Sequence, residues 1–160
     1  GEKILSKLES KYTKVIILRL FNVYGPGQNM ENMKQGMLSI YLSQILKHKK
    51  VFIKGSLNRF RDFVFIDDVI SALTHRFKKS NTYNVGFGKP YKVIDVIKIL
   101  FNLTKNSFNK KKIKFLTKHS GDPWGNFANI SKLKKIGWRP KFNLVLGAKE
   151  TVKSVLNKQS

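Results

Sequence analysis

Apolar residues follow two kinds of spacing along this chain, and the two kinds alternate. Apolar positions three and four residues apart predict helices over Glu2–Tyr12, Met37–His48, Val93–Leu103 and Leu144–Asn157. Short continuous runs of β-branched and aromatic residues predict strands over Val15–Leu20, Val51–Lys54, Asp62–Ile66, Tyr83–Gly88 and Ile113–Leu116. The run Val15–Leu20 is typical of a parallel sheet that helices cover on both faces. The alternation therefore predicts an α/β fold.

Polar residues and glycines mark where two further helices begin and end. The Asp67-Asp68 pair is placed to cap a helix over Val69–Leu73. Ser131 is expected to cap a short helix over Lys132–Ile136, which Gly137 then closes.

The predicted sheet is larger than the chain itself can supply. The helix over Glu2–Tyr12 has no capping residue before it, and Val15–Leu20 has too few neighbours for a strand buried on both faces. We therefore expect that an upstream segment is missing. An open strand edge invites pairing with another chain, so we expect dimers or larger homo-oligomers.

The composition indicates one globular domain without metal or membrane chemistry. The 160 residues are 41% hydrophobic and include 12 phenylalanines. The absence of cysteine excludes disulfides and thiolate metal sites, and the histidines at 48, 75 and 119 lack the spacing of metal ligands. No apolar run is long enough to cross a membrane, and residues 1–14 do not resemble a signal peptide. These features predict a cytoplasmic protein.

The formal net charge of +23 raises the question of nucleic-acid binding. Lysine supplies nearly all of it, with only five arginines, whereas nucleic-acid sites rely on arginine with interleaved aromatics. The densest run, Asn109–Lys114, is typical of a solvated loop that enters a strand. Nucleic acid is therefore not expected as the partner, and a non-catalytic module that binds polyanions stays as an alternative.

The stretch Gly55–Val69 contains the strongest candidate for an anion site. Arg61 stands at the mouth of a predicted buried strand, where its planar fork suits bidentate contact with a phosphate. The alternative is a simple ion pair of Arg61 with Asp62 or Asp67. Arg59, two residues earlier, is expected to face the other way if this segment is extended, and its loss is expected to matter little.

Asn22 is a second candidate because it follows the predicted strand Val15–Leu20. In open α/β sheets ligands bind beyond the carboxyl ends of the strands, so Asn22 is well placed to donate or accept a hydrogen bond there. The alternative is that Asn22 only caps the Gly- and Pro-containing turn that comes next.

Four motifs in order resemble the C-terminal half of the NAD-dependent epimerase/dehydratase family, the extended short-chain dehydrogenase/reductases, and most of all its UDP-glucose 4-epimerase-like members. They are residues 18–27 (LRLFNVYGPG), 61–69 (RDFVFIDDV), 83–88 (YNVGFG), and 121–140 with its GD, ANISK and GWRP elements. The resemblance implies a partial Rossmann-type parallel sheet plus a small mixed α/β substrate-binding domain. Residues 1–160 would form the nucleotide-sugar-binding part, with the N-terminal NAD-binding segment absent.

Two features of intact members of that family are not found in this sequence. No tyrosine has a lysine four residues later, and no Gly-x-Gly-x-x-Gly turn is present. The resemblance therefore implies no catalytic residue in this chain. It implies NAD as the cofactor of the intact enzyme, with none tightly bound here, and a chain that is inactive alone.

The resemblance assigns substrate roles to residues in three of the motifs and in the strand Val51–Lys54. Asn22 would bond the diphosphate–sugar region of a UDP-sugar, and Arg61 would grip the diphosphate. Phe52 and Lys54 lie on the strand whose backbone would meet the uracil. Phe21 and Val23 would lie beside the nicotinamide.

The last motif brings one match and one departure. Asp122 matches an acid that bonds the ribose hydroxyls, and three residues before it the family carries a second phosphate-binding arginine. Here His119 stands in that place, with Lys118 adjacent. A partly neutral imidazole then replaces a fixed charge, so strict specificity for UDP-hexoses is not implied.

The resulting prediction is the substrate-binding fragment of a nucleotide-sugar epimerase. In the intact enzyme NAD would take a hydride from C4 of the sugar and return it to the other face. A 4,6-dehydratase or decarboxylase of the same superfamily is the second enzymatic alternative, and it would need further acid/base residues.

Overall fold

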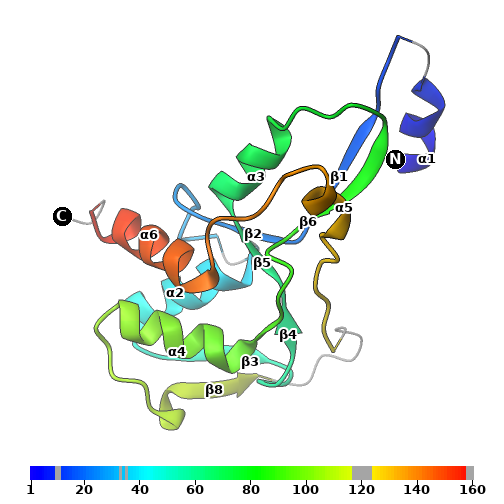
Figure 1. Ribbon diagram of the computed structural model, residues 1–160. Coiled ribbons are helices and arrows are strands. Elements are labelled where there is room, and N and C mark those ends of the chain that lie inside the picture. Colours follow the sequence, from blue (N-terminus) through cyan, green and yellow to red (C-terminus); the bar gives the residue numbers. More distant parts are fainter. Residues whose placement is uncertain (10–11, 33, 35, 117–123, 158–160) are drawn as a thin grey trace.

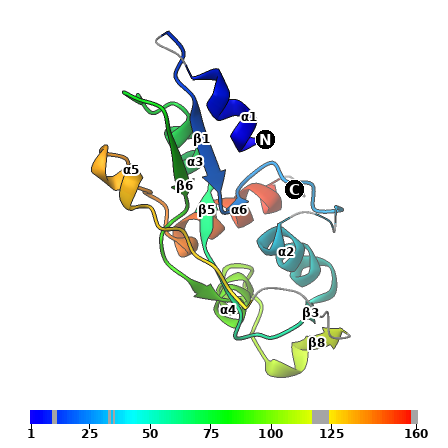
Figure 2. The same cartoon turned by 90° about the vertical axis from the view of Figure 1, so that its right-hand side faces the viewer.

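The computed structural model describes residues 1–9, 12–32, 34, 36–116 and 124–157. Its strands form four two-stranded pairs within the described part of the chain. Figures 1 and 2 both show β1 and β6 with helix α1 at one end of the molecule, and β3 and β8 with helix α4 at the other. Within the described residues no helix is long and apolar enough to cross a membrane.

The first end of the molecule is built on parallel strands. Strand β1 (Ile16–Leu20) pairs with β6 (Asn81–Val85), and β2 (Asn22–Tyr24) pairs with β5 (Phe63–Phe65). Helix α3 (Ile66–Leu73) follows β5 directly, and the short α5 (Ser131–Lys135) packs near β6. Trp138 and Leu133 are buried in this core, together with Val64, Val69, Ala72, Tyr83, Val85, Ala128 and Ile130.

The second end combines helices with two short strand pairs. Helices α2 (Met37–His48), α4 (Val93–Leu103) and α6 (Leu144–Asn157) share one core with β3 (Val51–Lys54). Strand β3 pairs in parallel with β8 (Ile113–Leu116), which the 3₁₀ helix η2 (Lys110–Lys112) precedes. Strands β4 (Phe60–Arg61) and β7 (Tyr91–Lys92) are antiparallel. The α/β fold with parallel strands is thus confirmed.

Several expected boundaries are confirmed and one helix is shorter than expected. The bounds of α2, α4, α6, β3 and β8 agree with the sequence pattern. The first helix does not run over Glu2–Tyr12, because α1 covers Glu2–Leu5 and a 3₁₀ turn, η1, covers Ser6–Leu8. Ile4 and Leu8 are exposed there, so no packed core extends this helix.

Both expected helix caps are wrong. Helix α3 already begins at Ile66, so Asp67 and Asp68 lie inside its first turn. The buried Asp68 carboxylate instead accepts bonds from the backbone N–H groups of Lys141 (2.8 Å) and Phe142 (3.0 Å). Helix α5 includes Ser131, whose N–H donates to Asn129 Oδ1 at 3.1 Å. The side chain of Asn129 therefore accepts a backbone N–H at the start of the helix that Ser131 was expected to cap.

Candidate functional site

Three segments meet beyond the carboxyl ends of β1 and β6. Phe21 follows β1, and its N–H donates to the carbonyl of Val85, the last residue of β6, at 2.9 Å. Asn22 comes next and donates from Nδ2 to the carbonyl of Asp62 at 2.7 Å. This end of a parallel sheet is where α/β proteins bind ligands. The half-buried side chains of Phe21 and Val23 pack against the core around β6.

Asp62 holds this junction together from a fully buried position. Its carboxylate accepts backbone N–H groups from Phe87 (2.9 Å), Gly88 (2.8 Å) and Ala128 (3.0 Å). Burial raises the pKa of Asp62, and the bonds from the N–H groups act against that rise. At Gly86 a Cβ atom would lie 2.6 Å from Asp62 Oδ2, so the close approach requires glycine. The Gly86-x-Gly88 spacing was the available sequence signal for this role.

Arg61 and Arg59 are both buried, at 7% and 5% exposure. Arg61 donates from Nη1 to the Phe60 carbonyl at 2.8 Å, and Arg59 donates to the carbonyls of Ser56 and Lys54. Burial lowers the pKa of Arg61, and the positive charge of Arg59 lowers it further. Burial raises the pKa of Tyr41 to about 12, although the positive charges of Arg59 and Arg61 act to lower it.

The expected outward direction of Arg59 is therefore wrong. Side chains two residues apart in an extended segment lie on the same face, so alternation itself places Arg59 with Arg61 and not opposite it. Residues 56–59 also form a turn, in which the Arg59 N–H donates to the Ser56 carbonyl. Within the described residues, ion pairs join Arg19 to Glu2 and Lys47 to Glu31, and none joins Arg61 to Asp62 or Asp67.

Phe52 and Lys54 are two residues apart in β3 and therefore lie on the same face of that strand. The carbonyl of Lys54 accepts a bond from Arg59, which ties β3 to the turn before β4. The Phe52 N–H donates to Gln44 Oε1 at 3.0 Å, and its ring meets that of His48 edge-on. Phe52 also borders a pocket of about 320 Å³, lined in addition by Glu31, Ser43, Gln44, Lys47 and His48.

The predicted His119 and Asp122 lie outside the described residues. The described chain resumes at Trp124, whose carbonyl accepts a bond from the Phe60 N–H at 3.3 Å. Gly125 forms a parallel bridge with Phe60. The chain that follows Asp122 therefore returns next to Arg61. The structure thus brings Asn22, Lys54 and Arg61 into one connected region.

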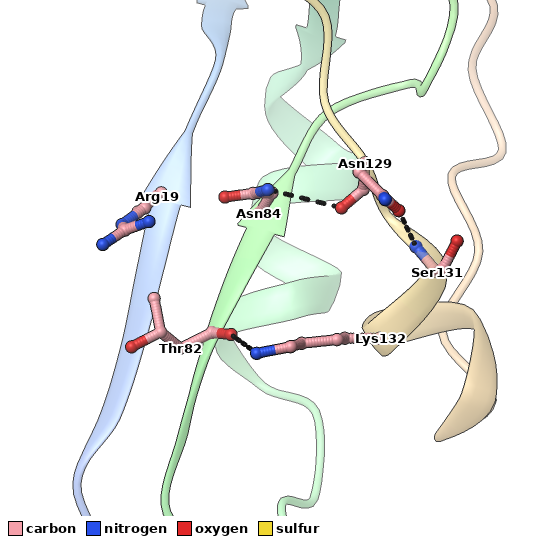
Figure 3. Close-up of a pocket in the computed structure, with 6 residues that line it drawn as sticks. All are labelled: Arg19, Thr82, Asn84, Asn129, Ser131 and Lys132. Atoms are coloured by element: carbon pink, nitrogen blue, oxygen red, sulfur yellow. Dashed lines mark hydrogen bonds between the residues drawn. The ribbon is translucent and has the colours of Figure 1, made fainter.

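A separate pocket of about 230 Å³ lies over β1 and β6, and Figure 3 shows its six lining residues. Its polar groups are largely bonded to each other. Arg19 pairs with Glu2 at 2.7 Å, Asn84 donates to the Asn129 carbonyl at 3.3 Å, and Lys132 donates to the Thr82 carbonyl at 3.4 Å. None of the predicted site residues lines this pocket, so it is not the candidate site.

The parallel pairs β1–β6 and β2–β5, with Asn22 and Asp62 just beyond the carboxyl ends of β1 and β6, define a Rossmann-type α/β protein. The model of the NAD dependent epimerase/dehydratase family matches residues 1–86. The chain belongs to this family, which confirms the resemblance drawn from the four motifs.

Individual relatives support the same assignment. A putative UDP-glucose 4-epimerase of Methanocaldococcus jannaschii is 32% identical over 98% of this chain and 50% of its own length. The solved UDP-glucose 4-epimerase of Thermotoga maritima with UDP-glucose has a TM-score of 0.85 and 28% identity, over 99% of this chain and 52% of its own. The solved dTDP-glucose 4,6-dehydratase of Bacillus anthracis with NAD has a TM-score of 0.76 and 25% identity, over 91% of this chain and 45% of its own. The chain thus spans about half the length of these relatives.

Proposed function

We propose that this chain provides the nucleotide-sugar-binding part of an NAD-dependent epimerase that acts on a UDP-sugar. The observation that carries the proposal is the pair of buried arginines, Arg59 and Arg61, of which Arg61 directly precedes Asp62, whose carbonyl accepts a hydrogen bond from Asn22. A guanidinium fork matches the oxygens of a phosphate, so a diphosphate is a ligand that an arginine at this place would bind. The relative from Thermotoga maritima, solved with UDP-glucose, supports this ligand class.

The neighbouring groups fit the rest of such a ligand. Asn22 uses its Nδ2 on the Asp62 carbonyl, so its Oδ1 is the atom that would accept a sugar hydroxyl. Phe52 has its N–H bonded to Gln44, so its carbonyl would accept from a uracil N–H. His119 and Asp122 are proposed to complete the phosphate and ribose contacts.

NAD would supply the hydride acceptor in the intact enzyme. Phe21 and Val23 are half-buried at the strand ends and fit one apolar wall for a nicotinamide ring. The 160 residues contain neither the glycine-rich turn nor the Tyr-x-x-x-Lys pair. We therefore expect the isolated chain to bind NAD weakly and to leave UDP-glucose unchanged.

Calorimetric titration of UDP and of uridine tests the role of Arg61. A charge-assisted hydrogen bond contributes about 1.5–3 kcal/mol, so Arg61→Ala should weaken UDP binding roughly ten- to a hundredfold. Arg61→Lys should recover only part, because an ammonium lacks the planar fork. Uridine has no diphosphate, so its affinity should not change. Arg139→Ala removes the same charge from an exposed position and serves as the control.

Equal losses of UDP and uridine affinity in Arg61→Ala would mean that Arg61 is merely structural.

A dehydratase acting on a dTDP-sugar is the second candidate, because the Bacillus anthracis dehydratase shares this fold. Titration of dTDP against UDP separates the two, since a preference for dTDP favours the dehydratase.

A further inference from the structure

A third pocket lies beside β6 and the connection that leads into its amino end. It has a volume of about 490 Å³ and is lined by Arg76, Lys78, Lys79, Tyr83, Lys135 and Ile136. Residues 76–79 belong to the connection between α3 and β6, which is at the amino end of the strand. The connection thus enters β6 at the end opposite Val85, whose carbonyl bonds the Phe21 N–H next to Asn22. This places the pocket outside the proposed nucleotide-sugar site.

Contacts between distant segments hold the pocket walls in place. His75 Nε2 lies 3.1 Å from the Ile136 carbonyl and joins the connection after α3 to the end of α5. The ring of Phe77 packs between those of His75 and Tyr83, with centroids 5.3 and 5.0 Å away. Lys132 donates to Asn81 Oδ1 at 3.2 Å and fixes α5 to the start of β6. The pocket is thus preformed by a packed aromatic cluster.

The lining is positive and contains no carboxylate. Arg76, Lys78, Lys79 and Lys135 contribute four cations, and the described ion pairs involve none of them. Tyr83 is only 3% exposed as a whole residue and borders the pocket, and its ring packs on Phe77. A phenol hydroxyl that borders a cationic pocket can donate a hydrogen bond to a ligand.

The helix dipole explains the position of only one of the four cations that line this pocket. Lys135 lies in the last turn of α5, where a cation interacts favourably with the exposed carbonyls. That effect does not account for Arg76, Lys78 and Lys79, which follow α3 in an irregular segment. Nor does it account for the hydroxyl of Tyr83. The four exposed cations line one pocket, whereas lysines that only solubilise a surface are dispersed.

We propose that this pocket binds a compact oligophosphate, such as the di- or triphosphate group of a small molecule. The volume lies within the range of about 300–1,000 Å³ that is usual for small-ligand sites. Lysine ammonium groups bind phosphate as point charges, and a phenol can donate to a phosphate oxygen. The proposal is independent of the proposed function, because it uses none of the residues near Arg61.

Titration of inorganic tripolyphosphate into the 160-residue chain, followed by amide NMR shifts, tests the site. The shifts should be saturable and centred on residues 74–83 and 132–137. The double variant Lys78→Ala/Lys79→Ala should weaken this binding at least about tenfold, because two of four close cations are lost. Lys110→Ala/Lys111→Ala removes the same charge from the exposed helix η2 and should change the affinity less than about twofold. Tyr83→Phe should weaken binding several-fold without a change in Tm.

Two results would overturn the proposal. Equal losses in the Lys78/Lys79 and Lys110/Lys111 variants would show that tripolyphosphate responds only to the overall charge. Tight binding of single-stranded oligonucleotides that grows with length, without saturable shifts from tripolyphosphate, would assign the surface to nucleic acid instead. Saturating UDP should leave the shifts of residues 74–83 unchanged, which separates failure here from failure at the Arg61 site.

Discussion

Single buried carboxylates organise the loops of this protein. Asp62 binds N–H groups of three residues from two distant segments, and Asp68 binds two from the segment before α6. Each satisfies backbone donors that no strand partner reaches. The sequence shows both as an acidic flank of an apolar run, which suggested ion pairing for Asp62 and capping for Asp68. Their partners lie 25 to 74 residues away, a separation that local patterns do not encode.

The contacts of Asp62 predict a specific loss of stability in Asp62→Asn. An amide keeps one acceptor oxygen, so at least one of the three buried N–H groups would face an NH₂ group instead. An unsatisfied buried donor costs about 1–3 kcal/mol, and urea unfolding should show a loss of that size. The exposed Asp67→Asn is the control and should stay within about 0.5 kcal/mol of the unmodified chain. Equal stability of the two variants would contradict the role given to Asp62.

At the scale of elements, packing decided which predictions were right. The helices α2, α4 and α6 each bury one apolar face in the shared core, and their bounds agree with the helical spacing. Helix α1 has the same spacing but no buried residue, and it is only one turn long before the 3₁₀ segment. Periodicity therefore predicts a helix correctly where a core is present to receive its face.

The closest packing of α6 lies at Gly147 and predicts the effect of Gly147→Ala. A Cβ there would collide with the Tyr24 hydroxyl and lie 2.8 Å from Phe65 Cδ2, and both rings are buried. Overpacking of this kind costs about 1–3 kcal/mol, against a gain of about 1 kcal/mol in helix propensity. Urea unfolding should therefore show a net loss. Gly36→Ala is the control, because φ is −61° and the nearest atom to its Cβ is 3.5 Å away. A more stable Gly147→Ala would mean that α6 shifts freely on β2 and β5.

At the scale of the whole molecule, the structure connects some of the predicted site residues and leaves the roles of all of them as predictions. Asn22 and Arg61 were predicted from strand ends, and the structure connects them through the backbone of Asp62. Arg59 was expected to face away from Arg61, but it is buried as well, because residues two apart in an extended chain share a face. Roles of His119 and Asp122 stay predictions, because these residues lie outside the described part of the chain.

The open edge of β1 predicts association between copies of the chain. In the described residues β1 pairs with β6 alone, and Ile4, Leu8 and Leu20 are 69%, 59% and 48% exposed. Repulsion from the net charge of +23 opposes association at low ionic strength. Sedimentation should therefore show dimers or larger species whose fraction rises as salt goes from about 0.05 to about 0.5 M, since screening weakens the repulsion.

Variants can locate that contact surface. Ile4→Lys/Leu8→Lys removes apolar area beside β1 and adds charge, so this variant should sediment mainly as a monomer. Val145→Lys/Leu146→Lys makes the same chemical change at exposed positions on α6 and should associate as the unmodified chain does. A clean monomer at high concentration and high salt would contradict association altogether. Equal effects of the two variants would mean that charge, and not the surface of β1 and α1, controls it.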